Sequence, residues 1–414
     1  MTWPGWFRRY RRQQCRALPR GLLALALLML SWLSACGERP PSVCIAGPSL
    51  QPPAEWPLNA RISTPITING HDASMGLDTG APFQFLFNPQ KFGLVLDPVM
   101  TASSARLIGG LSFTTGADVV MFGESIHKVP FALSDLPDPR YDGLLPWHTL
   151  QHVVTEIDWS DWRFCFHGGA PSAHDGWQMF AIDPLASRLW MIIPMTNGPP
   201  LRIMLDTGDP GSVLVDAATW RQVRDPGRET CSLTSDSYRL WTQDVSWVHT
   251  LSFGPLTLHD LPVSESFPND VEQREHPVRF GLYAMRQFDM IIDGPRARIY
   301  LRPTRRPPEP MRFNNLGATF PPAPSGDLVA HVVPGTPAAR AGVLDGDILL
   351  AMDGLRTDTH PTRHADLLFA IGIICRQPAG TVVRMQMRRG HDVLVCDATL
   401  RDILGSGNGS SPVP

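Results

Sequence analysis

The stretch SMGLDTGA at residues 74–81 returns in altered form as RIMLDTGDP at residues 202–210. Each copy is an apolar, strand-like run that ends in Asp-Thr-Gly, and each follows an Asn-Gly pair, which is typical of a hairpin turn. Asp78 and Asp206 are 128 residues apart (206 minus 78), which is long enough for half of a duplicated domain. The sequence therefore predicts an internal repeat.

Later landmarks of the two copies also correspond. DGLL at 142–145 and EID at 156–158 follow the first motif, and FGL at 280–282 and IID at 291–293 follow the second. A single Asp-Thr-Gly is weak evidence, because all three residues are common in turns. Two copies in equivalent halves indicate instead that two carboxyl groups are brought together across a pseudo-twofold axis.

Paired carboxyl groups can carry out general acid–base chemistry. Two carboxyl groups in contact do not both ionise cheaply, so the pair holds one proton. The ionised member can activate a water molecule to attack a peptide carbonyl group, and the protonated member can bind the carbonyl oxygen. Asp78 and Asp206 are thus the candidate catalytic residues.

The neighbours of the two aspartates suit a close approach of the two turns. Thr79 and Thr207 carry short hydroxyl groups that can bond the facing loop and lock the turns together. Gly80 and Gly208 have no Cβ, so their backbone can pass close to the opposite carboxyl group. We expect these four residues to support the site, because a loose pair would lose catalysis through misplacement alone.

Residues 60–302 resemble the retropepsin and pepsin clan of aspartic proteases, with both lobes in one chain. The resemblance implies a mainly β, two-lobed acid protease β-barrel fold, with lobe one at 59–180 and lobe two at 181–302. It implies an aspartic-type endopeptidase that acts on protein or peptide substrates. The segment Ile108-Gly109-Gly110 resembles the glycine-tipped flap that covers substrate; the alternative is a plain Gly-Gly turn.

The chain departs from the family pattern at three places. Asp209 follows the second motif, where the family has a small residue. The apolar-apolar-Gly landmark becomes Leu144-Leu145-Pro146 in lobe one and Leu282-Tyr283-Ala284 in lobe two, and the flap lacks a tyrosine. These departures keep an alternative open, namely a catalytically inactive, protease-like lipoprotein that binds peptides or serves as an adaptor.

The C-terminal part, expected at 312–404, resembles a bacterial PDZ domain, a small α+β fold. A strand at 327–333 precedes an Ala-rich helix that ends at Gly342, a Gly-Asp turn, a strand and an Asp-Gly hairpin, and two final strands flank the turn at 389–391. A PDZ domain binds an extended peptide ligand by strand addition. Leu316-Gly317-Ala318 is the candidate loop for the ligand carboxylate. The alternative is a PDZ domain that only packs on the protease or helps it dimerise.

The N-terminus is typical of an exported protein. A basic segment precedes the apolar run GLLALALLMLSWL at 21–33, and Leu-Ser-Ala-Cys at 33–36 resembles a lipobox, which implies a signal peptide at 1–36 and lipidation of Cys36. The alternatives are an ordinary signal peptide or an uncleaved anchor. A Pro-rich tether is expected at 37–58. The expected location is the periplasmic face of the cell envelope, with a lipid anchor in the membrane; Gly37 favours the outer membrane over the inner.

Composition limits the remaining function classes. The net charge of −3 predicts no nucleic-acid partner, and neither the histidines nor the cysteines show metal-ligand spacing, so no metal or cofactor is expected. In an oxidising compartment, Cys44 could pair with Cys165 and Cys375 with Cys396. The remaining segments are a linker at 303–311 and a disordered tail at 405–414.

Overall fold

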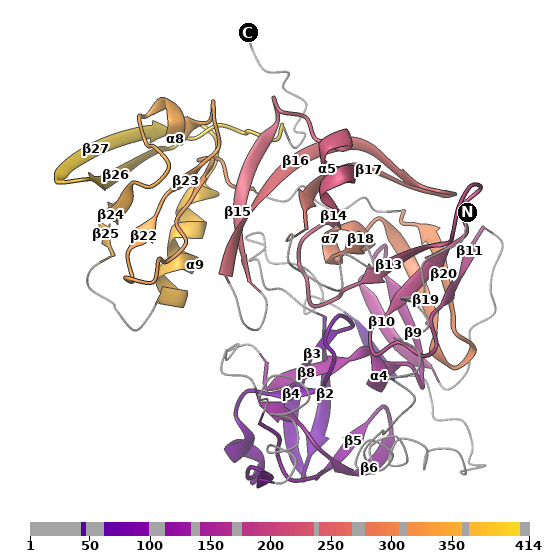
Figure 1. Cartoon of the computed structure of the whole chain (residues 1–414). Coiled ribbons are helices and arrows are strands. Elements are labelled where there is room, and N and C mark those ends of the chain that lie inside the picture. Colours follow the sequence, from indigo (N-terminus) through magenta and orange to yellow (C-terminus); the bar gives the residue numbers. More distant parts are fainter. Residues whose placement is uncertain are drawn as a thin grey trace, which may run out of the picture. The chain divides into compact units, whose positions relative to one another are not determined.

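The computed structural model describes residues 43–46, 62–98, 112–133, 141–167, 176–235, 240–266, 278–305, 313–357 and 364–405. These residues are mainly β, as predicted, and their long sheets curl (Figure 1). In this part of the chain, no helix is both long and apolar enough to cross a membrane. The expected signal peptide, Cys36 and the tail after residue 405 lie outside the described residues.

The first repeat forms a seven-stranded sheet in the order β6-β5-β2-β3-β8-β4-β7. Asn69 and Gly70, with φ of 49° and 80°, make the predicted two-residue turn between β2 and β3. Short helical turns η2 (Pro89–Phe92) and α4 (Trp147–Leu150) accompany the sheet. The strands are β2 (Ser63–Ile68), β3 (His71–Asp78), β4 (Phe85–Leu86), β5 (Ala117–Met121), β6 (Glu124–Val129), β7 (Ala132–Leu133) and β8 (Gly143–Pro146).

The second repeat reproduces this topology. In the first repeat β3 runs parallel to β8, β8 antiparallel to β4, and β4 parallel to β7. In the second, β13 runs parallel to β18, β18 antiparallel to β14, and β14 parallel to β17. The elements are β12 (Trp190–Ile193), β13 (Leu201–Leu205), β14 (Val213–Val215), α5 (Ala217–Val223), β15 (Glu229–Ser235), β16 (Leu240–Phe253), β17 (Leu256–Glu265), β18 (Val278–Phe280) and α7 (Leu282–Met285).

A shared sheet joins the two repeats. Strand β9 pairs with β19, so Ile157 lies opposite Met290, and the buried Asp289 accepts a hydrogen bond from the Trp159 amide at 3.0 Å. These strands belong to a 13-stranded sheet that continues into the second repeat. The strands in this part of the sheet are β9 (Val154–Asp158), β10 (Arg163–His167), β11 (Gln178–Ile182), β19 (Phe288–Asp293) and β20 (Arg298–Pro303). The short helical turn η3 (Gly294–Arg296) connects β19 to β20.

Part of the expected tether is a strand. β1 (Val43–Ala46) pairs antiparallel with β10, and the register places Cys44 opposite Cys165. The two cysteines form a disulfide, so this predicted pairing is confirmed. The tether interpretation of 37–58 is therefore wrong for these four residues, because a strand partner and a covalent bond fix them to the sheet.

The C-terminal domain is a small α+β unit with its own apolar core. The strand predicted at 327–333 divides at Ala330 into two strands that belong to different sheets, with β21 paired to β23 and β22 to β24. The elements are β21 (Ala318–Thr319), β22 (Leu328–Val329), β23 (His331–Val332), α8 (Pro337–Arg340), β24 (Ile348–Met352), β25 (Leu355–Arg356), α9 (His364–Cys375), β26 (Val382–Arg389) and β27 (Asp392–Thr399).

The predicted bridge between Cys375 and Cys396 is absent. Both residues are free thiols that pack in the apolar core of this domain. Burial raises the pKa of the Cys375 thiol to about 12, so it is a small hydrophobic side chain at neutral pH. Cys375 lies four residues after Ile371 and eight after Leu367, which puts all three on one face of α9.

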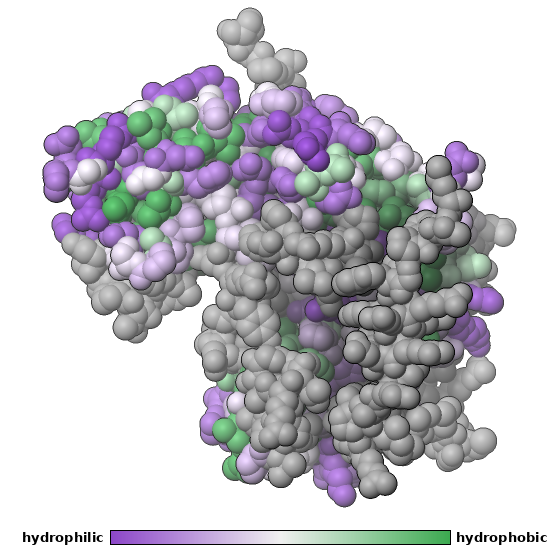
Figure 2. Space-filling model, viewed as in Figure 1, coloured by the Kyte–Doolittle hydropathy of each residue, from purple (hydrophilic) through white to green (hydrophobic). Residues whose placement is uncertain are grey.

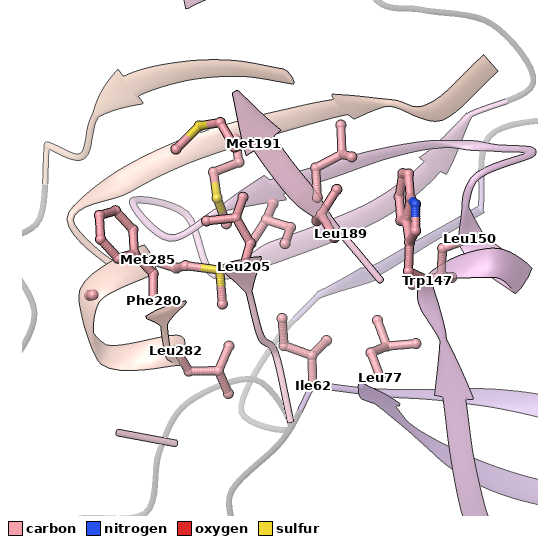
Figure 3. Close-up of a cluster of buried hydrophobic side chains, with 14 of the residues drawn as sticks. Ile62, Leu77, Trp147, Leu150, Leu189, Met191, Leu205, Phe280, Leu282 and Met285 are labelled. Carbon is pink, nitrogen blue, oxygen red and sulfur yellow. The ribbon is translucent and has the colours of Figure 1, made fainter. Parts of the chain in front are cut away.

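The main core runs through both repeats. Figure 3 shows Leu77 and Trp147 from the first repeat close to Leu205 and Leu189 from the second. Because the strands that carry the two Asp-Thr-Gly motifs contribute to one core, the motifs are held by the most buried part of the molecule. In the view of Figure 2, hydrophobic residues on the described surface are interspersed among hydrophilic ones.

Candidate active site

The two Asp-Thr-Gly turns meet, and their threonines bond each other's backbone. The Thr79 hydroxyl donates to the Leu205 carbonyl at 2.6 Å and accepts from the Thr207 amide at 3.0 Å. The Thr207 hydroxyl donates to the Leu77 carbonyl at 2.9 Å and accepts from the Thr79 amide at 3.0 Å. Both threonines are buried, so these four reciprocal bonds satisfy backbone groups that water does not reach.

The glycine of each turn lies against the carboxyl group of the other. A Cβ on Gly80 would overlap the Asp206 carboxyl group, and a Cβ on Gly208 would overlap that of Asp78. Asp78 is 9% exposed and Asp206 7%, so both are nearly buried but still reach the surface. Only glycine at both positions allows each turn to approach the opposite carboxyl group this closely.

The strand register revises one landmark. Pro146 lies opposite Asp78, and in the second repeat Phe280 lies opposite Leu205 and its carbonyl accepts from the Asp206 amide at 2.9 Å. The counterpart of Pro146 is therefore Gly281. The interpretation of Leu282-Tyr283-Ala284 as this landmark is wrong, because these residues form α7. A Cβ on Gly281 would overlap the Gly211 carbonyl, which explains a glycine at this position.

Two charged side chains, Arg279 and Asp209, lie beside the aspartate of the second motif. Arg279, on β18, places its Nη1 3.6 Å from Asp206 Oδ2 and its Nε 3.4 Å from Asp209 Oδ2. Asp209 Oδ1 accepts a hydrogen bond from the Gly211 amide at 2.8 Å. The sequence singled out Asp209 but not Arg279, because nothing in the local pattern shows which strand lies beside the motif.

The predicted flap residues Ile108, Gly109 and Gly110 lie outside the described residues. In the second repeat, the hairpin of β15 and β16 begins 23 residues after Asp206 (229 minus 206). The expected flap begins 30 residues after Asp78 (108 minus 78). Trp241 belongs to β16.

One histidine beside the first repeat, His148, is half-buried. His148 Nε2 lies 2.7 Å from Gln84 Oε1, at the start of α4. Burial, and to a lesser degree the charge of His152, lowers the pKa of His148 to about 4. The imidazole is therefore neutral at neutral pH and donates to Gln84.

We expect His148 to make the fold acid-sensitive. Between pH 6.5 and 4, His148 is protonated in the unfolded chain but not in the folded chain. The free energy of unfolding therefore falls as pH is lowered through this window, by up to about 3 kcal/mol. The His148→Gln variant should lose less stability than the wild type between pH 7 and pH 4 in urea denaturation. An identical pH dependence of the two proteins would contradict this assignment.

The candidate carboxylate loop of the C-terminal domain is already bonded internally. Asn314 Oδ1 accepts from the amides of Leu316 and Gly317 at 3.0 Å each. Gly317 has a φ of 73°, and Ala318 is buried and begins β21. Asn314 Nδ2 donates to the carbonyl of Cys231 on β15 at 2.9 Å, so this loop also contacts the second repeat.

Residues 328–389 match the family model of the PDZ domain. The match runs from β22 to β26, so this part of the sequence-based resemblance is confirmed, and PDZ domains bind peptides. A PDZ domain in this chain therefore suggests a protein–peptide interaction. The loop at 314–318 precedes the matched residues. No curated protein matches the chain.

The second repeat contacts the PDZ domain through further polar groups. Thr242 Oγ1 lies 2.8 Å from Thr319 Oγ1, and the Thr230 hydroxyl donates to the Asn314 carbonyl at 2.6 Å. His331 Nε2 lies 3.4 Å from Asp244 Oδ1, and this contact raises the pKa of His331. The hairpin of β15 and β16 is therefore bonded to β21 and β23.

Proposed function

We propose that the chain is an aspartic-type endopeptidase in which Asp78 and Asp206 activate a water molecule. The observation that carries the proposal is the reciprocal packing of each carboxyl group over the glycine of the other turn. Symmetric threonine bonds hold the turns in this arrangement. A hydrolytic pair needs this degree of fixation, because misplacement of a reacting group by about 1 Å can cost about 100-fold in rate.

The proposed reaction uses one shared proton. The ionised carboxyl group takes a proton from water, and the resulting hydroxide bonds to the peptide carbonyl carbon. The protonated carboxyl group hydrogen-bonds the carbonyl oxygen as negative charge develops there. The nitrogen then receives a proton from the pair, and the carbon–nitrogen bond breaks. No metal or cofactor is required for these steps.

The test is proteolysis of an unfolded protein. The chain without residues 1–36 is incubated with a reduced, alkylated protein between pH 4 and pH 8, and products are identified by mass spectrometry. Discrete fragments with new carboxyl and amino ends support the proposal. Saturable binding without fragments supports the second candidate, a peptide-binding adaptor, which is motivated by the charges of Asp209 and Arg279 beside Asp206.

The PDZ domain is proposed to recruit protein substrates or to gate their access. The bonds from Thr319 and Asn314 to the hairpin of β15 and β16 provide a physical link between peptide binding and the second repeat. A ligand carboxylate would have to compete with Asn314 for the Leu316 and Gly317 amides. Internal segments of unfolded proteins, which have no terminal carboxylate, would meet no such competition.

We therefore expect the free C-terminus of a ligand to contribute little to binding. Each displaced hydrogen bond of Asn314 costs about 1 kcal/mol, which offsets the gain from the carboxylate. A peptide selected from a random library should bind within about tenfold of its C-terminally amidated form in calorimetry. A loss of more than 100-fold on amidation would contradict this expectation.

The proposed location is the bacterial cell envelope, with a lipid on Cys36 as the membrane anchor. The disulfide between Cys44 and Cys165 supports export, since such bonds persist in oxidising compartments. Metabolic labelling with a radioactive fatty acid tests the anchor. Label should enter the wild-type chain but not the Cys36→Ala variant.

A further inference from the structure

The two repeats differ at a pair of equivalent positions beside the motifs. Ala81 follows the first Asp-Thr-Gly and Asp209 the second. The register places Leu144 opposite Gly76 in the first repeat and Arg279 opposite Met204 in the second, each two residues before an aspartate. Ala81 and Leu144 belong to one buried apolar cluster, whereas Asp209 and Arg279 form an ion pair. An apolar contact on one side of the site is thus replaced by opposite charges on the other.

The Arg279 guanidinium has unused hydrogen-bonding capacity. Its contacts with Asp206 at 3.6 Å and Asp209 at 3.4 Å are longer than the 2.7–2.9 Å of charge-assisted hydrogen bonds. Its Nε is buried and makes no hydrogen bond to any described residue. The side chain is 21% exposed, so part of it faces solvent.

We propose that Arg279 is a specificity-determining residue that binds a carboxylate of the substrate beside the scissile bond. The inference rests on the proposed endopeptidase function and names its substrate class. A guanidinium presents five N–H donors in a planar fork that matches a carboxylate. Because Nη1 lies 3.6 Å from Asp206, a group bound by Arg279 lies within about one residue of the bond that the activated water molecule attacks.

The substrate preference then comes from the second repeat. At the equivalent positions the first repeat has Ala81 and Leu144, which are buried in an apolar cluster. The second offers Arg279, which suits aspartate or glutamate, while Asp209 holds the guanidinium in place and is itself oriented by the Gly211 amide. The substrates are peptides with an acidic residue beside the cleaved bond. Since Asp206 and Asp209 already neutralise part of the cationic charge, the preference is moderate.

The experiment compares cleavage of matched peptides. Cleavage sites of the wild type in an unfolded protein are mapped, and peptides are made that differ only by Glu or Gln at the acidic position. The wild type should cleave the Glu peptide with about tenfold higher kcat/KM, which corresponds to about 1.4 kcal/mol. The paired variant Arg279→Leu with Asp209→Ala installs the residues of the first repeat. Its ratio of kcat/KM for the Glu peptide to kcat/KM for the Gln peptide should fall to about one. The ratio is insensitive to the overall rate.

Control variants separate specificity from folding. Arg279→Lys keeps the charge and should retain a ratio of a few fold, and Arg279→Gln should behave like the paired variant. Circular dichroism and the Tm establish that each variant is folded. Cleaved bonds without acidic enrichment on either side, or an enrichment that the paired variant keeps, overturn the inference.

A second readout covers the case in which the wild type cuts nothing. Peptides from a protein digest are passed over the immobilised wild type and the paired variant, and the retained peptides are sequenced. Enrichment of acidic residues on the wild type alone supports binding by Arg279 although the proposed catalysis has failed. Equal retention on both proteins overturns the inference as well.

Discussion

The Asp206→Asn variant is expected to cleave an unfolded protein at least about 100-fold more slowly than the wild type, because an amide cannot share the proton that general acid–base catalysis needs. The substitution preserves volume and keeps an oxygen that can accept from the Gly208 amide, as Asp206 Oδ1 does at 3.0 Å. The fold should therefore survive. Fragment yield by mass spectrometry, at matched protein concentration, measures the effect.

A matched control separates the site from general loss of charge. Asp72 is exposed on β3, six residues before Asp78, and Asp72→Asn should cleave at the wild-type rate. Asp78→Asn should be as inactive as Asp206→Asn, because the two carboxyl groups act as a unit. Equal cleavage by the wild type and Asp206→Asn would end the endopeptidase proposal and leave the peptide-binding adaptor.

The Thr207→Val variant should lose about 3 kcal/mol in the free energy of unfolding. The Thr207 hydroxyl accepts from the Thr79 amide and donates to the Leu77 carbonyl, and valine leaves both backbone groups buried without this partner. Each unsatisfied buried group costs about 1–3 kcal/mol. The same change should slow cleavage, since the bonds that align Asp78 with Asp206 are lost. Urea denaturation gives the stability, and fragment yield the activity.

Thr207→Ser is the matched control for this prediction. Serine keeps the hydroxyl and its two bonds, so its loss of stability should be less than half that of the valine variant. If valine and serine cost the same, the methyl group rather than the hydroxyl group holds the turns, and the reciprocal bonds have little weight.

The repeat and its consequences were predictable from the sequence because the decisive signals are local. Asp-Thr-Gly after an apolar run, with Asn69-Gly70 before the first copy, predicts a hairpin and a strand that ends at the aspartate, as β2 and β3 show. The alternating strands at the end of the PDZ domain were predictable for the same reason. Division of the strand at 327–333 was not, because it depends on two different partner sheets.

The surroundings of the candidate site depended on register. Neither Arg279 beside Asp206 nor Asn314 on the Leu316 and Gly317 amides follows from spacing, since strand pairing and turn geometry select these neighbours. The lowered pKa of His148 likewise depends on the packing around α4, which residue spacing does not show.

The sequence by itself determined that the chain is mainly β, that it contains two equivalent Asp-Thr-Gly halves and that it ends in a PDZ domain, because periodicity, turn residues and repetition are properties of neighbouring residues. Tertiary structure alone decided that each aspartate packs over the other half's glycine and that Arg279 lies beside Asp206. These contacts join residues between 70 and 130 positions apart, and only the burial of one common core brings them together.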